Sequence, residues 1–145
     1  MVAGRLTIGA HVDFNLALAI TGQSSRPPPS DESMGQNAID LEHLARYTGG
    51  ERELNSEVLR LFDDQITKMV AELHTLLASR DAKRWREVAH SIKGAARGVG
   101  AFSMGDLAAF AEPISPTDAP AAKDVIAKLE REAQTVRAFI EAYLA

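Results

Sequence analysis

The sequence predicts an all-α protein, an antiparallel four-helix bundle with a short N-terminal covering helix. Apolar residues recur every three to four positions through most of the chain from residue 41 onward, which is the spacing of one face of an α-helix. No stretch shows the sustained apolar–polar alternation of a half-buried strand. The segments that join the periodic stretches are mostly short, so consecutive helices should pack beside one another in opposite directions.

Length and composition limit what this chain can be. Its 145 residues, 46% hydrophobic and 25% charged, fit one domain with a solvated surface. The net charge of −4 and the lack of a basic run argue against nucleic acid as a partner. The absence of cysteine excludes disulfides and thiolate metal sites and fits a cytoplasmic location. No apolar run approaches the roughly 20 residues of a membrane-spanning helix, so we expect no membrane contact.

Residues 1–37 differ from the rest and are expected to form a flexible extension to a domain at 38–145. The run from Val12 to Ile20 is interrupted by Asp13 and Asn15, which disfavours a secretory signal peptide. The residues after it are polar and surround three consecutive prolines. Such a linker buries too little apolar area to order itself.

The domain should open with a short helix followed by a long one. Asp40 is a candidate N-cap for the short helix, and the glycine pair that begins at Gly49 ends it within about two turns. We expect this helix to cover one end of the core. The long helix should run from about Arg52 to Ala78. Its apolar residues keep the helical spacing: Leu54, Val58, Leu61, Phe62, Ile66, Met69, Leu73, Leu76 and Leu77.

The next helix should return beside the long one, with Asp81 as its candidate cap and Gly98 and Gly100 at its end. Its apolar face consists of Trp85, Val88, Ala89, Ile92, Ala96 and Val99.

Two more helices should complete the bundle. Ser103 and Asp106 resemble a capping pair for a helix that runs to Glu112. Its inward-facing residues are expected to be Leu107, Phe110 and Ala111. An extended connection should follow, enforced by Pro113, Pro116 and Pro120. An apolar stripe from Val125 to Tyr143 then predicts the last helix.

The helix after Asp81 has an outer face of unusual composition. One stripe, with the spacing i, i+3, i+4 and i+7, holds His90, Lys93, Gly94 and Arg97. Glycine in a helix costs about 1 kcal/mol relative to alanine, so the close approach of another surface is the most direct compensation. An exposed histidine is largely neutral above pH 7 and offers a ring nitrogen as a nucleophile without help from a base.

The run His90-Ser91-Ile92-Lys93-Gly94, with Gly100-Ala101 and a helix that ends near Glu112, resembles the signature of histidine-containing phosphotransfer (HPt) domains. The resemblance extends from Asp40 to the end of the chain. It implies that His90 is the phosphoacceptor and that Lys93 stabilises the phosphoryl group. The small Gly94 would leave room for a docking partner.

Some HPt domains have a glutamine near the end of the following helix that helps to position the histidine. The matching residue here is Glu112, whose carboxylate cannot donate the hydrogen bonds of an amide to phosphate. We therefore assign Glu112 to partner docking. Arg97 is either a surface charge or a contact for an acidic partner, and we assign it to partner docking as well.

The resemblance also implies the partners. A receiver domain of a hybrid histidine kinase would donate the phosphoryl group from a phospho-aspartate, and a response regulator receiver domain would accept it. The sequence contains no G-x-x-x-x-G-K-[ST] run, so the donor must be another protein and the chain is not itself a kinase. We expect a monomer with no cofactor of its own, because Mg²⁺ belongs to the receiver.

Two other functions fit the same residues: a helical adaptor that binds through this face without chemistry, and the phosphoacceptor fragment of a larger histidine kinase. Glu87 and His90 have the spacing of a di-iron ligand pair, but no second pair exists and both point away from the apolar stripe. The other histidines lack comparable neighbours. We expect His43 to be solvated and His74 to lie at the boundary of the long helix.

Overall fold

The computed structural model describes residues 38–145, so the predicted extension and linker at residues 1–37 lie outside the described part. The prediction of an all-α fold is confirmed for residues 38–145, which form five helices and no strand. The helices are α2 (Leu41–Thr48), α3 (Arg52–Ser79), α4 (Ala82–Val99), α5 (Phe102–Ala111) and α6 (Ala119–Leu144). None of these helices is long and apolar enough to cross a membrane.

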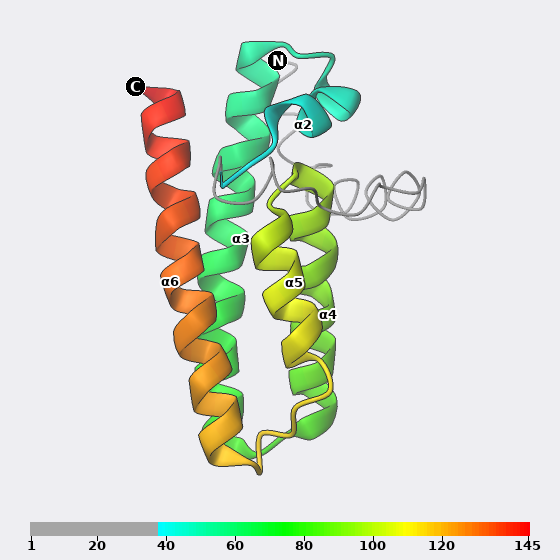
Figure 1. Ribbon diagram of the computed structural model, residues 1–145, viewed down its shortest axis with the longest axis vertical. Coiled ribbons are helices and arrows are strands. Elements are labelled where there is room, and N and C mark those ends of the chain that lie inside the picture. Colours follow the sequence, from blue (N-terminus) through cyan, green and yellow to red (C-terminus); the bar gives the residue numbers. More distant parts are fainter. Residues whose placement is uncertain (1–37) are drawn as a thin grey trace.

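The four longer helices lie lengthwise beside one another, with α2 near one end (Figure 1). α3 packs against α4 and α6, and α5 packs against the same two helices. The links from α3 to α4 and from α4 to α5 span only residues 80–81 and 100–101. Such short links keep each helix beside the one before it, and the four helices enclose one apolar core.

Local signals start and end these helices much as the sequence predicts. Asp40 and Asp81 cap α2 and α4, since each carboxylate accepts a backbone N–H hydrogen bond at 3.0 Å. Gly49 and Gly100 end the same two helices with φ values of 71° and 92°. At Gly100 a side chain is also excluded by contact, because a Cβ there would lie 2.6 Å from the carbonyl oxygen of Asp40.

The predicted start of α5 is wrong. The helix begins at Phe102, with Ala101 in the N-cap position, and no side chain caps it. Ser103 and Asp106 therefore do not form a capping pair. The carboxylate of Asp106 instead lies 3.5 Å from the guanidinium of Arg97 on α4. Packing against α4, rather than a local cap, determines where α5 starts.

Two further predictions for this region are wrong. Of the three residues expected to face inward, Ala111 is buried and Leu107 packs half-buried against the core, but Phe110 is 59% exposed. The other buried residues of α5 are Met104, Gly105 and Ala108. Pro120 lies in the first turn of α6, and the link at residues 112–118 contains hydrogen-bonded turns and is not an extended connection. A first-turn position suits proline, since its missing N–H would have no helical partner there.

The apolar face predicted for α4 is confirmed, since all six of its residues are buried. Trp85 is fully buried, and its indole Nε1–H donates to the carbonyl oxygen of Ala111 at 2.9 Å. This hydrogen bond fastens the end of α5 to α4. Because Ala111 is followed by Glu112, the same bond helps to position the Glu112 side chain at the outer face of α4.

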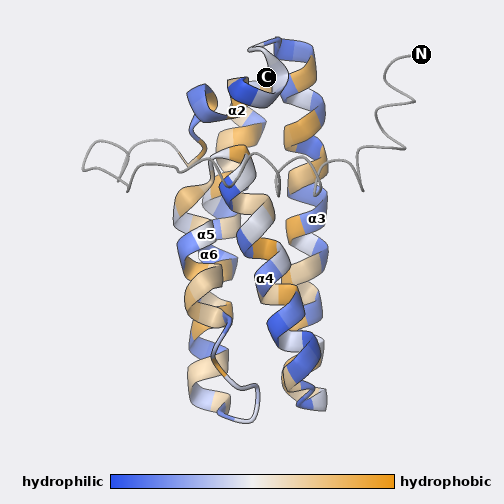
Figure 2. Ribbon diagram, turned by 90° about the vertical axis from the view of Figure 1, so that its right-hand side faces the viewer, coloured by the Kyte–Doolittle hydropathy of each residue, from blue (hydrophilic) through white to orange (hydrophobic). Residues whose placement is uncertain are grey.

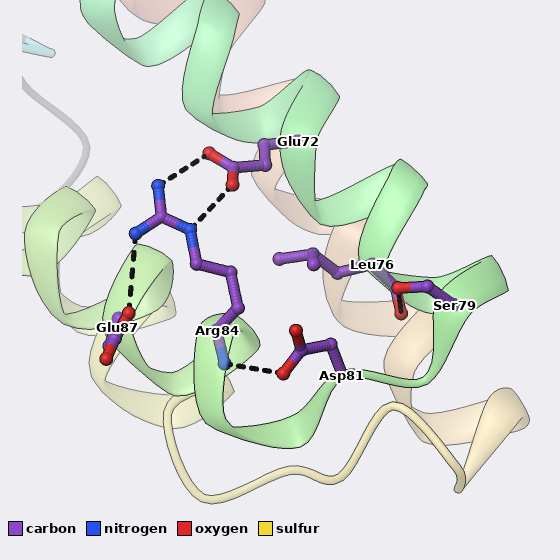
Figure 3. Close-up of polar contacts among 6 residues, drawn as sticks. All are labelled: Glu72, Leu76, Ser79, Asp81, Arg84 and Glu87. Atoms are coloured by element: carbon purple, nitrogen blue, oxygen red, sulfur yellow. Dashed lines mark hydrogen bonds and ion pairs between the residues drawn. The ribbon is translucent and has the colours of Figure 1, made fainter.

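On the outside of the bundle, Arg84 ties the start of α4 to α3 (Figure 3). Its guanidinium donates to both carboxylate oxygens of Glu72, at 2.7 and 3.1 Å. It also donates to Glu87 at 3.3 Å. The hydrogen bonds to Glu72 first, and then to Glu87, raise the pKa of Arg84 above its usual value. Arg84 is thus engaged within the bundle.

Candidate functional site

His90 lies on the outer face of α4, opposite the core, and its side chain is 68% exposed. The ring Nδ1 lies 2.6 Å from Oε2 of Glu112. A carboxylate only accepts hydrogen bonds, so this contact assigns the N–H to Nδ1. No other described residue hydrogen-bonds to the ring. The contact therefore leaves Nε2 with its lone pair and without a partner in residues 38–145.

Glu112 joins His90 to Lys93. Its Oε1 accepts a hydrogen bond from Nζ of Lys93 at 2.8 Å, while Oε2 accepts from His90. The side chains of Glu112 and Lys93 are only 21% and 23% exposed. Burial raises the pKa of Glu112, but the hydrogen bonds from Lys93 and His90 outweigh burial, and the pKa lies below its usual value. A charged carboxylate thus holds an imidazole and an ammonium group together at neutral pH.

Gly94 leaves the surface next to His90 open. A Cβ added at Gly94 would meet no atom within 4 Å. Packing inside the bundle therefore does not require glycine here, and its unfavourable helix propensity of about 1 kcal/mol is not compensated by a contact with the described residues. This observation agrees with a surface that another molecule approaches.

Arg97 lies two turns beyond His90 and leans over α5. Its Cγ would be 2.7 Å from a Cβ added at Gly105, so this glycine makes room for the arginine. Nη2 of Arg97 lies 3.5 Å from Asp106, whereas Nε is buried and has no hydrogen-bond partner in residues 38–145. Arg97 therefore shares the face of His90, with its stem held against α5.

The structure brings three of the sequence-predicted site residues into direct contact: His90, Lys93 and Glu112. Gly94 and Arg97 lie on the same outer stripe of α4 and make no contact with that group. Sequence reasoning missed Glu112 as the acceptor shared by His90 and Lys93. It also missed Gly105 and Asp106, which support Arg97. These partners lie on another segment, so the helical spacing of α4 carries no signal for them.

The other described histidines lie outside this group. Nε2 of His74 is 2.6 Å from Glu130 on an exposed part of the surface. The prediction of a solvated His43 is wrong, since its ring is half-buried and packs edge-on against Tyr47 and Phe102, with centroids 5.7 and 5.1 Å away. The fourth histidine lies outside the described residues. Within residues 38–145, no cluster of three or more histidines and carboxylates could hold a metal ion.

The helical fold and the exposed histidine on α4 agree with a comparison against known families. The family model described as Hpt domain matches residues 57–139, more than half of the chain. The chain therefore belongs to the Hpt domain family. Searches of curated proteins and of solved structures gave no match.

Membership of this family defines the general activity. Hpt domains are phosphotransfer modules of two-component signalling and have no kinase activity of their own. They interact with receiver domains of kinases and of response regulators. Involvement in phosphotransfer thus follows from the family for this chain.

Proposed function

We propose that this chain is a phosphorelay intermediate with His90 as its phosphoacceptor. It accepts a phosphoryl group from the receiver domain of a hybrid histidine kinase and passes it to the receiver domain of a response regulator. In this proposal α3 to α6 form the antiparallel four-helix bundle of an HPt domain. The observation that carries the proposal is the exposed His90 ring, whose Nδ1 is bonded to the carboxylate that also binds Lys93.

Nε2 of His90 is the nucleophile in the proposed reaction. Its lone pair attacks the phosphorus of the phospho-aspartate, and the bond from phosphorus to the aspartate oxygen breaks as the carboxylate leaves with the electron pair. The ring keeps its proton on Nδ1 and becomes a phosphorylated imidazolium beside Glu112. In the second transfer the aspartate of the next receiver attacks the same phosphorus. Nε2 then leaves as part of a neutral imidazole, so no general base is needed.

Lys93 and Glu112 have different roles in this reaction. Lys93 lies one turn from His90 and stabilises the phosphoryl oxygens. An exposed charge pair contributes only about 0.2–1 kcal/mol, but the interaction strengthens when the partner excludes water. Glu112 accepts the Nδ1–H of His90 and so acts as a positioning residue. The Mg²⁺ that assists the transfer belongs to the receiver domain, and this chain needs no cofactor of its own.

The partner docks over the same face, where Gly94 allows close approach and Arg97 and Glu112 border the site. The proposal includes a monomeric, cytoplasmic protein that binds neither nucleic acid nor membranes. Residues 38–145 act as the phosphotransfer domain, and residues 1–37 as an extension to it.

The test is incubation with a panel of receiver domains phosphorylated with labelled acetyl phosphate and Mg²⁺. The proposal predicts that at least one receiver transfers label to this chain within minutes. A second, unphosphorylated receiver should then remove the label. Tight binding of receivers without any transfer of label would instead support a helical adaptor.

A further inference from the structure

A line of basic residues runs along α4 through His90. The spacing of these residues alternates between three and four, which keeps them on one stripe of the helix. The stripe consists of Lys83, Arg86, His90, Lys93 and Arg97. At 1.5 Å per residue it is about 21 Å long.

This line is unusual within the protein. α4 holds five lysines and arginines but only one carboxylate, that of Glu87. None of the other four described helices has a net positive charge, and the chain as a whole carries −4. Figure 2 shows hydrophilic residues interspersed along α4, whose apolar residues point into the core. Among the helices of residues 38–145, the one that carries His90 is therefore the basic one, although the chain as a whole is acidic.

The cations of α4 differ in whether a carboxylate neutralises them. Lys93 and Arg97 each face a carboxylate from the α5 side, and Arg84 is held by two carboxylates (Figure 3). Lys83 and Arg86 are exposed, and neither side chain makes a hydrogen bond or ion pair with the described residues. The positive charge left for a partner thus lies on the N-terminal side of His90.

We infer that Lys83 and Arg86 form an electrostatic docking site for the receiver domain that exchanges phosphate with His90. This inference rests on the proposed function, which supplies the receiver as the partner. Charge complementarity selects an acidic surface, and the receiver brings one, since a dianionic phosphoryl group and the carboxylates that hold Mg²⁺ must come next to His90. Lys83 and Arg86 lie about 10 and 6 Å before His90 along the helix. The first distance is comparable to the Debye length of about 10 Å at 0.1 M salt, and the second is shorter.

The proposed docking site gives the complex an orientation. The acidic rim of the receiver lies over the first half of α4, and its reacting aspartate lies over His90. Surface charges of this kind mainly raise the rate of productive encounter and barely change the chemistry of the bound complex.

The test compares transfer rates from the fastest receiver of the panel. The variant Lys83→Glu/Arg86→Glu should lower the second-order transfer rate at 50 mM salt by about tenfold or more. At saturating receiver its rate should stay within about twofold of wild type. The second-order transfer rate of the neutral variant Lys83→Gln/Arg86→Gln should lie between those of wild type and the double reversal. Salt at 500 mM should remove most of the difference between these rates. Glutamate and glutamine are good helix formers, and positions 83 and 86 lie outside the core, so the fold should persist.

Arg131→Glu is the matched control. Arg131 is exposed on α6, a helix that α5 and α3 separate from α4, and it makes no side-chain ion pair with the described residues. This charge reversal, half the change in net charge of the double variant, should leave the transfer rate within about twofold. If the double reversal transfers as fast as Arg131→Glu, the docking site is refuted while the phosphorelay stands.

Two other outcomes would overturn more than the contribution of Lys83 and Arg86. If no receiver binds or labels the wild-type protein, both the docking site and the proposed function fail. If wild type binds duplex DNA more tightly than any receiver, and the double reversal abolishes that binding, the partner of this stripe is a nucleic acid.

Discussion

Replacing Gly94 with alanine should stabilise the protein. The added Cβ meets no atom within 4 Å, and alanine is favoured over glycine inside a helix by up to about 1 kcal/mol. The entropy of unfolding is about 2.1 cal/mol/K per residue. For a domain the size of residues 38–145, a gain of about 1 kcal/mol therefore corresponds to a rise in Tm of about 4 °C.

Gly105→Ala provides a matched comparison in the next helix. Its Cβ would lie 2.7 Å from Cγ of Arg97, so the arginine stem has to move. Arg97 cannot move freely, since its Nε is already buried. The same gain in helix propensity is thus opposed by a displaced side chain, and the Tm of Gly105→Ala should be at or below that of wild type.

Circular dichroism at 222 nm during heating measures the Tm of both variants. The transfer assay then distinguishes an effect on docking from an effect on stability. Gly94→Gln should keep a Tm near that of wild type but lose about 100-fold in transfer rate, because a displacement of about 1 Å at the reacting atoms has an effect of this size. A lower Tm for Gly94→Ala than for Gly105→Ala would refute the packing argument. Unimpaired transfer by folded Gly94→Gln would move the docking site to another face.

Three further predictions concern the groups around His90. Lys93→Ala should keep receiver binding but slow the formation of phosphohistidine or shorten its lifetime, as measured by the rise and decay of label; unchanged kinetics would remove Lys93 from the site. The lowered pKa of Glu112 means that its stabilising effect is fully present above the usual value near 4.5 and is lost as pH falls through the lowered value. The difference in free energy of unfolding between wild type and Glu112→Gln, measured with urea, should therefore be larger at pH 7 than at pH 3. An equal difference at the two pH values would contradict the ion pair. Trp85→Phe removes one of the two hydrogen bonds that the Ala111 carbonyl accepts, while the backbone N–H of Ile114 still donates to it at 3.0 Å. This change should lower the free energy of unfolding in urea by about 0.5–1.5 kcal/mol; an unchanged stability would show that the indole hydrogen bond contributes nothing.

Much of α4 could be predicted from its sequence because the determining signals are local. Asp81 marks its start, Gly100 its end, and the spacing of its apolar residues gives the buried face. The outer stripe around His90 then follows by geometry. The same reasoning failed for α5, which is short and rich in alanine, so no periodic pattern shows which face is buried. Packing against α4 decides that Phe110 points outward.

The contact of Glu112 with His90 and Lys93 could not be derived from spacing along the chain. Glu112 is 22 residues from His90 and follows a different helix. Its position depends on how α5 packs against α4 and on the hydrogen bond from Trp85 to the end of α5. The resemblance to HPt domains pointed to this position in the chain. Only the three-dimensional structure revealed that both carboxylate oxygens are engaged.

The most direct test of the central claim is to map the phosphorylated residue after incubation with the phosphorylated receiver panel. The wild-type protein should carry label on His90 alone, and the label should be lost in acid and resist alkali, as a phosphoramidate does. His90→Gln should keep the wild-type Tm within a few degrees, because the side chain is 68% exposed and lies outside the core, and it should take up no label. Label that persists in folded His90→Gln would contradict the assignment of His90 as the phosphoacceptor.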